Sequence, residues 1–175
     1  MSSYPPLTWY TIADGLRRFN AFPKSSRSAT LADTNDTDAS ACVGGSCACR
    51  SVSFEVDGPL DQAQYCHCSR CQRARSGAFA SNGFTALENV RFTRGEAHLK
   101  SFKIPNAKYF TQTFCDTCGS LMPRLDLERG IAVIPFGGFD ISPALTPSRH
   151  VHVASKVPWI QIADELPQFG SAKPN

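Results

Sequence analysis

Residues 66–71 read Cys66-His67-Cys68-Ser69-Arg70-Cys71, which places three cysteines within six residues in a C-x-C-x-x-C pattern. Two further pairs bracket this stretch, Cys47-Ala48-Cys49 before it and Cys115-Asp116-Thr117-Cys118 after it. Seven of the eight cysteines therefore fall into three tight clusters. Such clusters can form disulfides, a redox site or a metal site, and the function depends on which of these they form.

The two bracketing pairs together provide four thiolates. Both spacings allow two sulfurs to point at one centre, and Gly119 after Cys118 suits the tight turn of a metal-binding knuckle. A disulfide within C-x-C would close a small, strained ring, and the chain shows no secretory signal that would favour disulfides. The spacing therefore predicts a closed, tetrahedral zinc site of the structural type. Its ligands would be Cys47, Cys49, Cys115 and Cys118.

The central cluster provides only three sulfurs, those of Cys66, Cys68 and Cys71. Three protein ligands with a fourth position open are typical of a catalytic or ligand-binding zinc, and this is the interpretation we favour. Two alternatives stay open: a closed site with Cys42 as the fourth ligand, and thiols without metal that serve redox chemistry or metal buffering. Cys42 can equally be a small buried residue outside any site.

Arginines crowd the central cluster at positions 70, 73 and 75. Their positive field would lower the pKa of nearby thiols and favour an anionic ligand. We predict Arg70 and Arg73 as contacts for an anionic substrate, with Arg75 nearby.

The histidines lack the spacing of metal ligands. In an extended C-x-C segment the side chain of His67 points away from the sulfurs, so we expect it to support the ligands or pack behind them. We expect His98 on the surface. His150 and His152 would share one face of a strand and serve packing.

Most of the chain after Cys47 consists of short runs with the period of β-strands, separated by Gly and Pro. Val52, Phe54 and Val56 alternate with polar residues, and Asp57-Gly58-Pro59 then forms a turn. Further strand candidates are 64–66, 78–84, 90–94, 99–102, 108–114, 121–122, 131–136 and 150–153. Only 69–75 and 158–166 favour a helical turn or two. The pattern predicts an all-β domain with few helical turns.

At 175 residues, of which 42% are hydrophobic, the chain suits one domain with additional tail. We predict an N-terminal extension and polar linker over 1–41, a zinc-binding domain over 42–170 and a tail over 171–175. In the extension, Trp9, Ile12, Leu16 and Phe19 have helical spacing and favour a helix or clamp packed on the domain surface, or a segment that binds a partner.

Composition excludes several classes of function. A net charge of +3 is too small to predict nucleic-acid binding, and no apolar run is long enough to cross a membrane. We expect a cytoplasmic protein. The Arg- and Ser-bearing first thirty residues are a weak alternative indication of an organelle transit peptide.

The ordered motifs together resemble one known family. They are Gly45-Ser46-Cys47-Ala48-Cys49, Cys66 to Cys71, Gly77, Phe114 to Ser120, Gly138-Phe139-Asp140, His150-Val151-His152 and Pro158-Trp159. This pattern, from 44 to about 169, is similar to that of the glutathione-dependent formaldehyde-activating family, which also contains centromere protein V. The resemblance implies an Mss4-like fold of several coiled antiparallel β-sheets. It also implies a structural zinc at the four bracketing cysteines and a second zinc, associated with activity, at the central three.

The resemblance further implies a zinc-dependent carbon–sulfur lyase or synthase that acts on a glutathione–aldehyde adduct such as S-hydroxymethylglutathione, or on a related small thiol adduct. The alternative is a zinc-supported binding module without catalysis that contacts protein or chromatin partners. A small thiol is the expected partner of the enzyme, no membrane is expected, and a homo-oligomer is compatible with the sequence.

Overall fold

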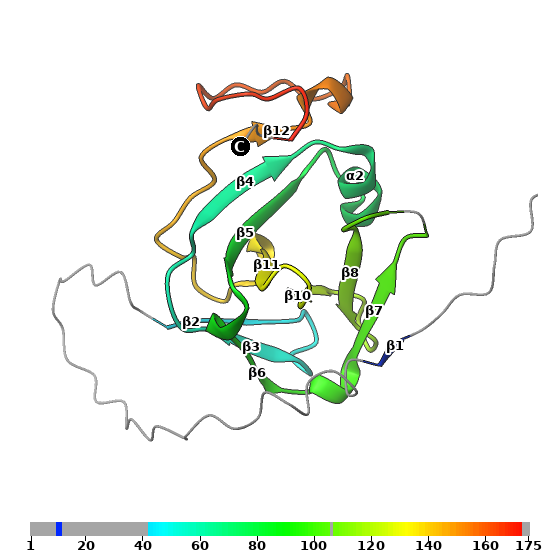
Figure 1. The fold of residues 1–175 in the computed structure, drawn as a ribbon, viewed down its shortest axis with the longest axis vertical. Helices are drawn as coiled ribbons and strands as arrows, with labels where there is room; N and C mark the ends of the chain where they lie inside the picture. The colour runs from blue at the N-terminus through cyan, green and yellow to red at the C-terminus, as the bar shows by residue number, and fades with distance from the viewer. Residues whose placement is uncertain (1–9, 12–41, 106, 173–175) are drawn as a thin grey trace, which may run out of the picture.

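Three β-sheets and one short α-helix make up the described part of the computed structural model, which covers residues 10–11, 42–105 and 107–172 (Figure 1). The strands are β1 (Tyr10–Thr11), β2 (Val43–Ser46), β3 (Ser53–Val56), β4 (Gln62–Cys66), β5 (Ala80–Ala86), β6 (Val90–Arg94), β7 (Leu99–Lys103), β8 (Thr111–Cys115), β9 (Leu121–Met122), β10 (Arg124–Asp126), β11 (Ile131–Pro135) and β12 (His150–Val151). The helix is α2 (Ser69–Arg75), and 3₁₀ turns lie at Leu87–Asn89, Glu96–His98, Phe136–Gly138 and Val153–Ser155. The prediction of a mainly β fold is confirmed.

The three-stranded sheet has the order β2-β3-β6, all antiparallel. Phe54 and Val56 of β3 are buried, and the residues between them are not, as the alternating sequence predicts. Leu99 of β7, Met122 of β9 and Ile134 of β11 join them in one hydrophobic core. This core is therefore shared by all three sheets.

The five-stranded sheet has the order β10-β11-β5-β4-β12. Its first four strands are antiparallel, whereas β12 pairs in parallel with the end of β4, with Val151 opposite Cys66. In Figure 1, β12 and the C-terminal segment lie along the outer side of β4, beyond α2. The C-terminal part of the chain thereby reaches the strand that carries the central cysteine cluster.

The four-stranded sheet has the order β1-β7-β8-β9. Tyr10 and Thr11 pair with Ser101 and Lys100, so two residues of the N-terminal extension add a strand to the edge of this sheet. The helical spacing of Trp9, Ile12, Leu16 and Phe19 falls on residues that lie outside the described ranges.

Helix α2 matches the predicted range 69–75. The Sγ atom of Cys68 accepts a hydrogen bond from the backbone N–H of Cys71 and caps the helix, and Ser76 ends it in the left-handed conformation. Of the helical turns predicted at 158–166, the structure contains only a turn at 158–159. On either side of this range, the backbone N–H groups of 152–154 donate to the carbonyls of 169–171, so the chain folds back on itself. Within the described ranges, no helix is long and apolar enough to span a membrane.

Gly45 of β2 provides a test of how tightly the sheets pack. A Cβ atom at Gly45 would lie 2.2 Å from Cζ of Phe54 and 2.3 Å from the carbonyl oxygen of Gly138, while at Gly44 the nearest atom is 3.9 Å away. We expect Gly45→Ala to lower the free energy of unfolding by about 1–3 kcal/mol and Gly44→Ala to change it by less than about 0.5 kcal/mol. Urea denaturation at fixed zinc concentration measures both, and equal stabilities would contradict the packing described.

Candidate metal centres

The four bracketing cysteines meet at a junction between two sheets. Cys47 and Cys49 lie between β2 and β3, Cys115 is the last residue of β8, and Cys118 lies between β8 and β9. Each pair forms a tight turn: Arg50 donates its N–H to the Cys47 carbonyl, and Gly119, in the left-handed conformation, donates to that of Cys115. Gly119 therefore lies in a tight turn of the kind that the sequence predicts for a metal-binding knuckle. The cluster therefore joins segments that the chain order keeps far apart.

The sulfur positions fit a tetrahedral zinc ion. The four sulfurs lie within 4.8 Å of one another, and Cys49 Sγ lies 3.4 Å from that of Cys47 and 3.9 Å from that of Cys115. A Zn–S distance of about 2.3 Å in tetrahedral geometry gives sulfur separations of about 3.8 Å. The Val52 N–H donates to Cys47 Sγ, as expected for a supported thiolate.

The pKa values in this cluster differ with the surroundings of each thiol. Burial raises the pKa of Cys47 to about 11, whereas hydrogen bonding to Ser120 lowers the pKa of Cys118 to about 6. Cys49 has a pKa below its usual value because Ser51 bonds to its sulfur. Cys49 and Cys118 therefore ionise more readily than an ordinary thiol, and the buried Cys47 ionises when a cation compensates its charge.

The central cluster forms where β4 gives way to α2. Cys66 is the last residue of β4, Cys68 caps α2 and Cys71 lies in its first turn, and their sulfurs lie within 4.8 Å of one another. Cys66 is buried and the other two are partly exposed. Three sulfurs in this arrangement can hold one ion and leave a coordination position for another ligand.

The three thiols of the central cluster differ in pKa. Hydrogen bonds from Cys66 and Cys71 lower the pKa of Cys68, while the same contacts raise the pKa values of Cys66 and Cys71. Cys42 takes no part: it is exposed, and neither metal-binding group found in the described residues includes it. Both interpretations of Cys42, as fourth ligand and as a buried residue, are therefore wrong. It precedes β2, in the sheet that carries the other cysteine cluster.

The arginines of α2 differ in where they point. Arg70 and Arg73 are exposed, whereas Arg75, one helical turn after Cys71, is partly buried and donates to Asn82 Oδ1 and Gln112 Oε1. Burial lowers the pKa of Arg75, and attraction to Cys71 opposes this shift. The guanidinium therefore lies in the electric field of the cluster, and the two side chains that accept its hydrogen bonds are neutral amides. Helical periodicity, which pairs i with i+4, could have singled out Arg75.

Two cavities meet at Arg75. The smaller, of about 120 Å³, is lined by Cys71, Arg75, Arg124 and Gln112 among others. The larger, of about 560 Å³, lies beside Cys47 and is lined also by Arg50, Arg75 and Asp140. Of these two cavities, only the smaller reaches a ligand of the central cluster, through Cys71. Arg124, which sequence reasoning missed, is held there by Asp126 at 3.0 Å.

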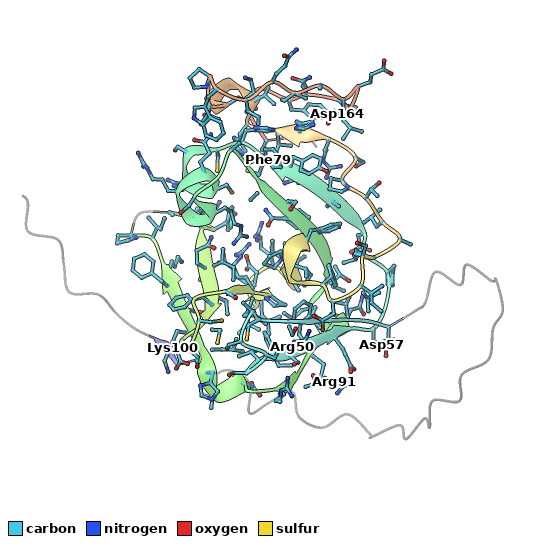
Figure 2. All side chains as sticks on the ribbon, turned by 180° about the vertical axis from the view of Figure 1, so that it is seen from behind. Arg50, Asp57, Phe79, Arg91, Lys100 and Asp164 are labelled. Atoms are coloured by element: carbon cyan, nitrogen blue, oxygen red, sulfur yellow. The ribbon has the colours of Figure 1, made fainter. Side chains whose placement is uncertain are left out.

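A chain of three hydrogen-bonded polar side chains, two of them buried, lies behind the central cluster. His67 is fully buried, and its Nε2 lies 2.8 Å from Nδ1 of His150, whose Nε2 lies 3.1 Å from both carboxylate oxygens of Asp164. Burial lowers the pKa of His67, so the ring is held neutral. Figure 2 shows Asp164 beside β12, near Phe79, at the opposite end of the molecule from Arg50 and Arg91. No local sequence pattern indicates the contact between His67 and His150.

The other histidines are simpler. His98 is exposed, as predicted, and lies 3.1 Å from Asp116. His152 is not on a strand with His150, because β12 ends at Val151 and His152 has a φ of 58°. The expected shared face of 150 and 152 is therefore wrong.

Comparison with known proteins agrees with these motifs. The family model described as glutathione-dependent formaldehyde-activating enzyme matches residues 42–155. Among solved structures, a Rhodobacter sphaeroides protein from a structural genomics programme is 22% identical, with a TM-score of 0.45, over 59% of this chain and 91% of that one. No curated protein matches the chain. The match to the family model spans more than half of the sequence, and the chain belongs to the glutathione-dependent formaldehyde-activating enzyme family.

Proposed function

We propose that the protein is a zinc-dependent carbon–sulfur lyase or synthase, which makes or breaks the adduct between glutathione, or a similar small thiol, and an aldehyde. The observation that carries the proposal is the three-sulfur cluster that opens, through Cys71, on a cavity bearing two arginines. A structural zinc site would need neither an open position nor a lined cavity. The family to which the chain belongs supports the choice of reaction.

The reaction forms a C–S bond and an O–H bond and breaks an S–H bond and the C=O π bond. The thiol sulfur bonds to the aldehyde carbon, the C=O π bond opens toward oxygen, and the thiol proton ends on that oxygen. A zinc ion held by Cys66, Cys68 and Cys71 would supply Lewis-acid stabilisation of the charge that develops on sulfur or oxygen.

Residues of the chain supply charge and shape. Arg75 and Arg124 place positive charge beside Cys71, where an anionic substrate would be bound. Three thiolates and a divalent cation carry a net charge of −1, so a positive field here also offsets the charge of the cluster. We place the substrate carboxylates on Arg75 and Arg124 rather than on the exposed Arg70 and Arg73 that the sequence suggested. The larger cavity beyond Arg75 has room for the remainder of a peptide-like thiol.

The test is a measurement of exchange between glutathione and S-hydroxymethylglutathione by magnetisation-transfer NMR, with zinc content determined in the same samples. We expect two zinc ions per chain and an exchange rate above that of the uncatalysed reaction. Protein with both ions that leaves the exchange of every tested thiol–aldehyde pair unchanged would overturn the proposal and favour a binding module.

Arg75 provides a prediction about substrate recognition. We expect Arg75→Gln to raise KM for glutathione about 10-fold or more, because a charge-assisted hydrogen bond contributes about 1.5–3 kcal/mol, while kcat changes little. Arg75→Lys should recover part of the loss, since lysine keeps the charge without the two-pronged geometry.

The exposed Arg73 on the same helix is the matched control, and Arg73→Gln should leave KM unchanged. Steady-state kinetics with 2-mercaptoethanol, which carries no carboxylate, separates two roles of Arg75. An equal effect of Arg75→Gln on both thiols would show that the guanidinium acts on the reacting sulfur and not on a carboxylate.

A further inference from the structure

We infer that His150 and Asp164 are positioning residues for the central metal site: they hold His67, and through it the ligands Cys66 and Cys68 on either side. The inference rests on metal binding at the three-cysteine cluster and not on the reaction proposed above. Asp164 lies beyond residue 155, where the match to the family model ends.

The hydrogen bonds of the chain fix the tautomers of both histidines. With both rings neutral, the Asp164 carboxylate accepts a hydrogen bond from Nε2–H of His150, and Nδ1 of His150 is left as an acceptor. The 2.8 Å contact then requires His67 to donate from Nε2. Nδ1 of His67 is thus the unprotonated nitrogen, and it is the one buried side-chain nitrogen or oxygen in the described residues without a hydrogen-bond partner. The Asp164 carboxylate therefore orients the ring of His150 and, through it, the ring of His67.

The backbone of His67 is held by the same region. Its N–H donates to the carbonyl of Val151 at 2.9 Å. Its carbonyl accepts from Nε2 of Gln72 at 2.6 Å, and that amide also donates to the carbonyl of Ser155 at 2.8 Å. Every polar group of His67 except Nδ1 is therefore bonded, and residues 150–155 take part in each of these contacts, directly or through Gln72.

The consequence concerns the two ligands that flank His67. A residue fixed in its N–H, carbonyl and ring leaves little freedom to the peptide units that join it to Cys66 and Cys68. Groups that orient metal ligands from outside the coordination sphere change metal affinity about 10-fold to 100-fold when they are removed. The four-cysteine site has no contact with this segment among the interactions described and serves as an internal control.

The experiment measures zinc affinity with a competing chromophoric chelator on full-length protein. For Asp164→Ala we expect the weaker of the two sites to lose affinity about 10-fold, with the four-cysteine site and the melting temperature unchanged. Asp164→Asn keeps an acceptor oxygen and should lose less zinc affinity than Asp164→Ala. Glu165→Ala, at the exposed neighbouring position, is the matched control and should behave as wild type.

Imidazole ¹⁵N NMR supplies a second readout that a general structural role would not move. We expect both rings to be Nε2–H tautomers in the wild type. In Asp164→Ala we expect the His150 ring to become a mixture of the Nε2–H and Nδ1–H tautomers. Unchanged ring signals, or changed ring signals with unchanged zinc affinity, would overturn the inference. Loss of both zinc ions together with a lower melting temperature, or a wild-type protein that binds one zinc, would also overturn it. Asp164 is the position of choice because it is partly exposed, whereas substitution of the buried His150 risks the fold itself.

Discussion

Cys115→Ser is expected to leave the domain without a stable fold. Cys115 is fully buried at the end of β8, and its sulfur lies 3.9 Å from that of Cys49 across the junction of two sheets. Binding of a structural zinc by thiolates contributes about 10–16 kcal/mol, which is comparable with the whole stability of an ordinary domain, about 5–15 kcal/mol. Loss of one of four ligands therefore removes enough free energy to unfold the protein at 25 °C.

Circular dichroism and zinc content of the purified variant measure this result. Cys42→Ser is the matched control, because Cys42 is exposed and belongs to neither cluster, and it should keep the fold and both zinc ions. A chelator strong enough to remove the four-cysteine zinc from the wild type should produce the same unfolded state. A Cys115→Ser protein with a cooperative melting transition near that of the wild type would show that the sheets hold together without this metal.

Features set by local periodicity were predictable from the sequence. Alternation in 52–56 predicts β3 and its buried face, and the spacing of the cysteines predicts both clusters. Helical spacing within 69–75 also places Arg75 on the same side of the helix as Cys71, and this separates it from the exposed Arg70 and Arg73. Arg70 and Arg73 were predicted as substrate contacts only because they are close to the cysteines in sequence.

Features that depend on pairing between distant segments were not predictable. The contact of His67 with His150 joins residues 83 positions apart. It exists because β12 pairs in parallel with β4, and no local pattern encodes that pairing. The incorrect prediction of helical turns at 158–166 has a related cause. The residues before this segment, 152–154, form backbone hydrogen bonds to 169–171, and no local pattern predicts that pairing. A local sequence pattern predicts which face of a strand or helix is buried, but it does not predict which other element packs against that face.

Cys68→Ser is expected to abolish activity while the fold survives. The substitution removes one of three sulfurs from the central cluster, and a metal-ion contribution of several kcal/mol to the transition state corresponds to a loss of at least about 100-fold in rate. The fold should survive because Cys68 caps α2 by accepting from the Cys71 N–H, and serine is among the best residues at this position.

The measurements are zinc content, melting temperature and the exchange rate of S-hydroxymethylglutathione. We expect one zinc per chain in place of two, a melting temperature within a few degrees of the wild type, and exchange at the uncatalysed rate. Cys68→Ala separates the two roles of the residue, because it removes the sulfur and the cap together and should destabilise the protein by about 1 kcal/mol more than serine does. Full exchange activity in a Cys68→Ser protein with a single zinc would mean that the reaction does not use the central cluster, and it would move the search for the active site to the larger cavity beside Cys47.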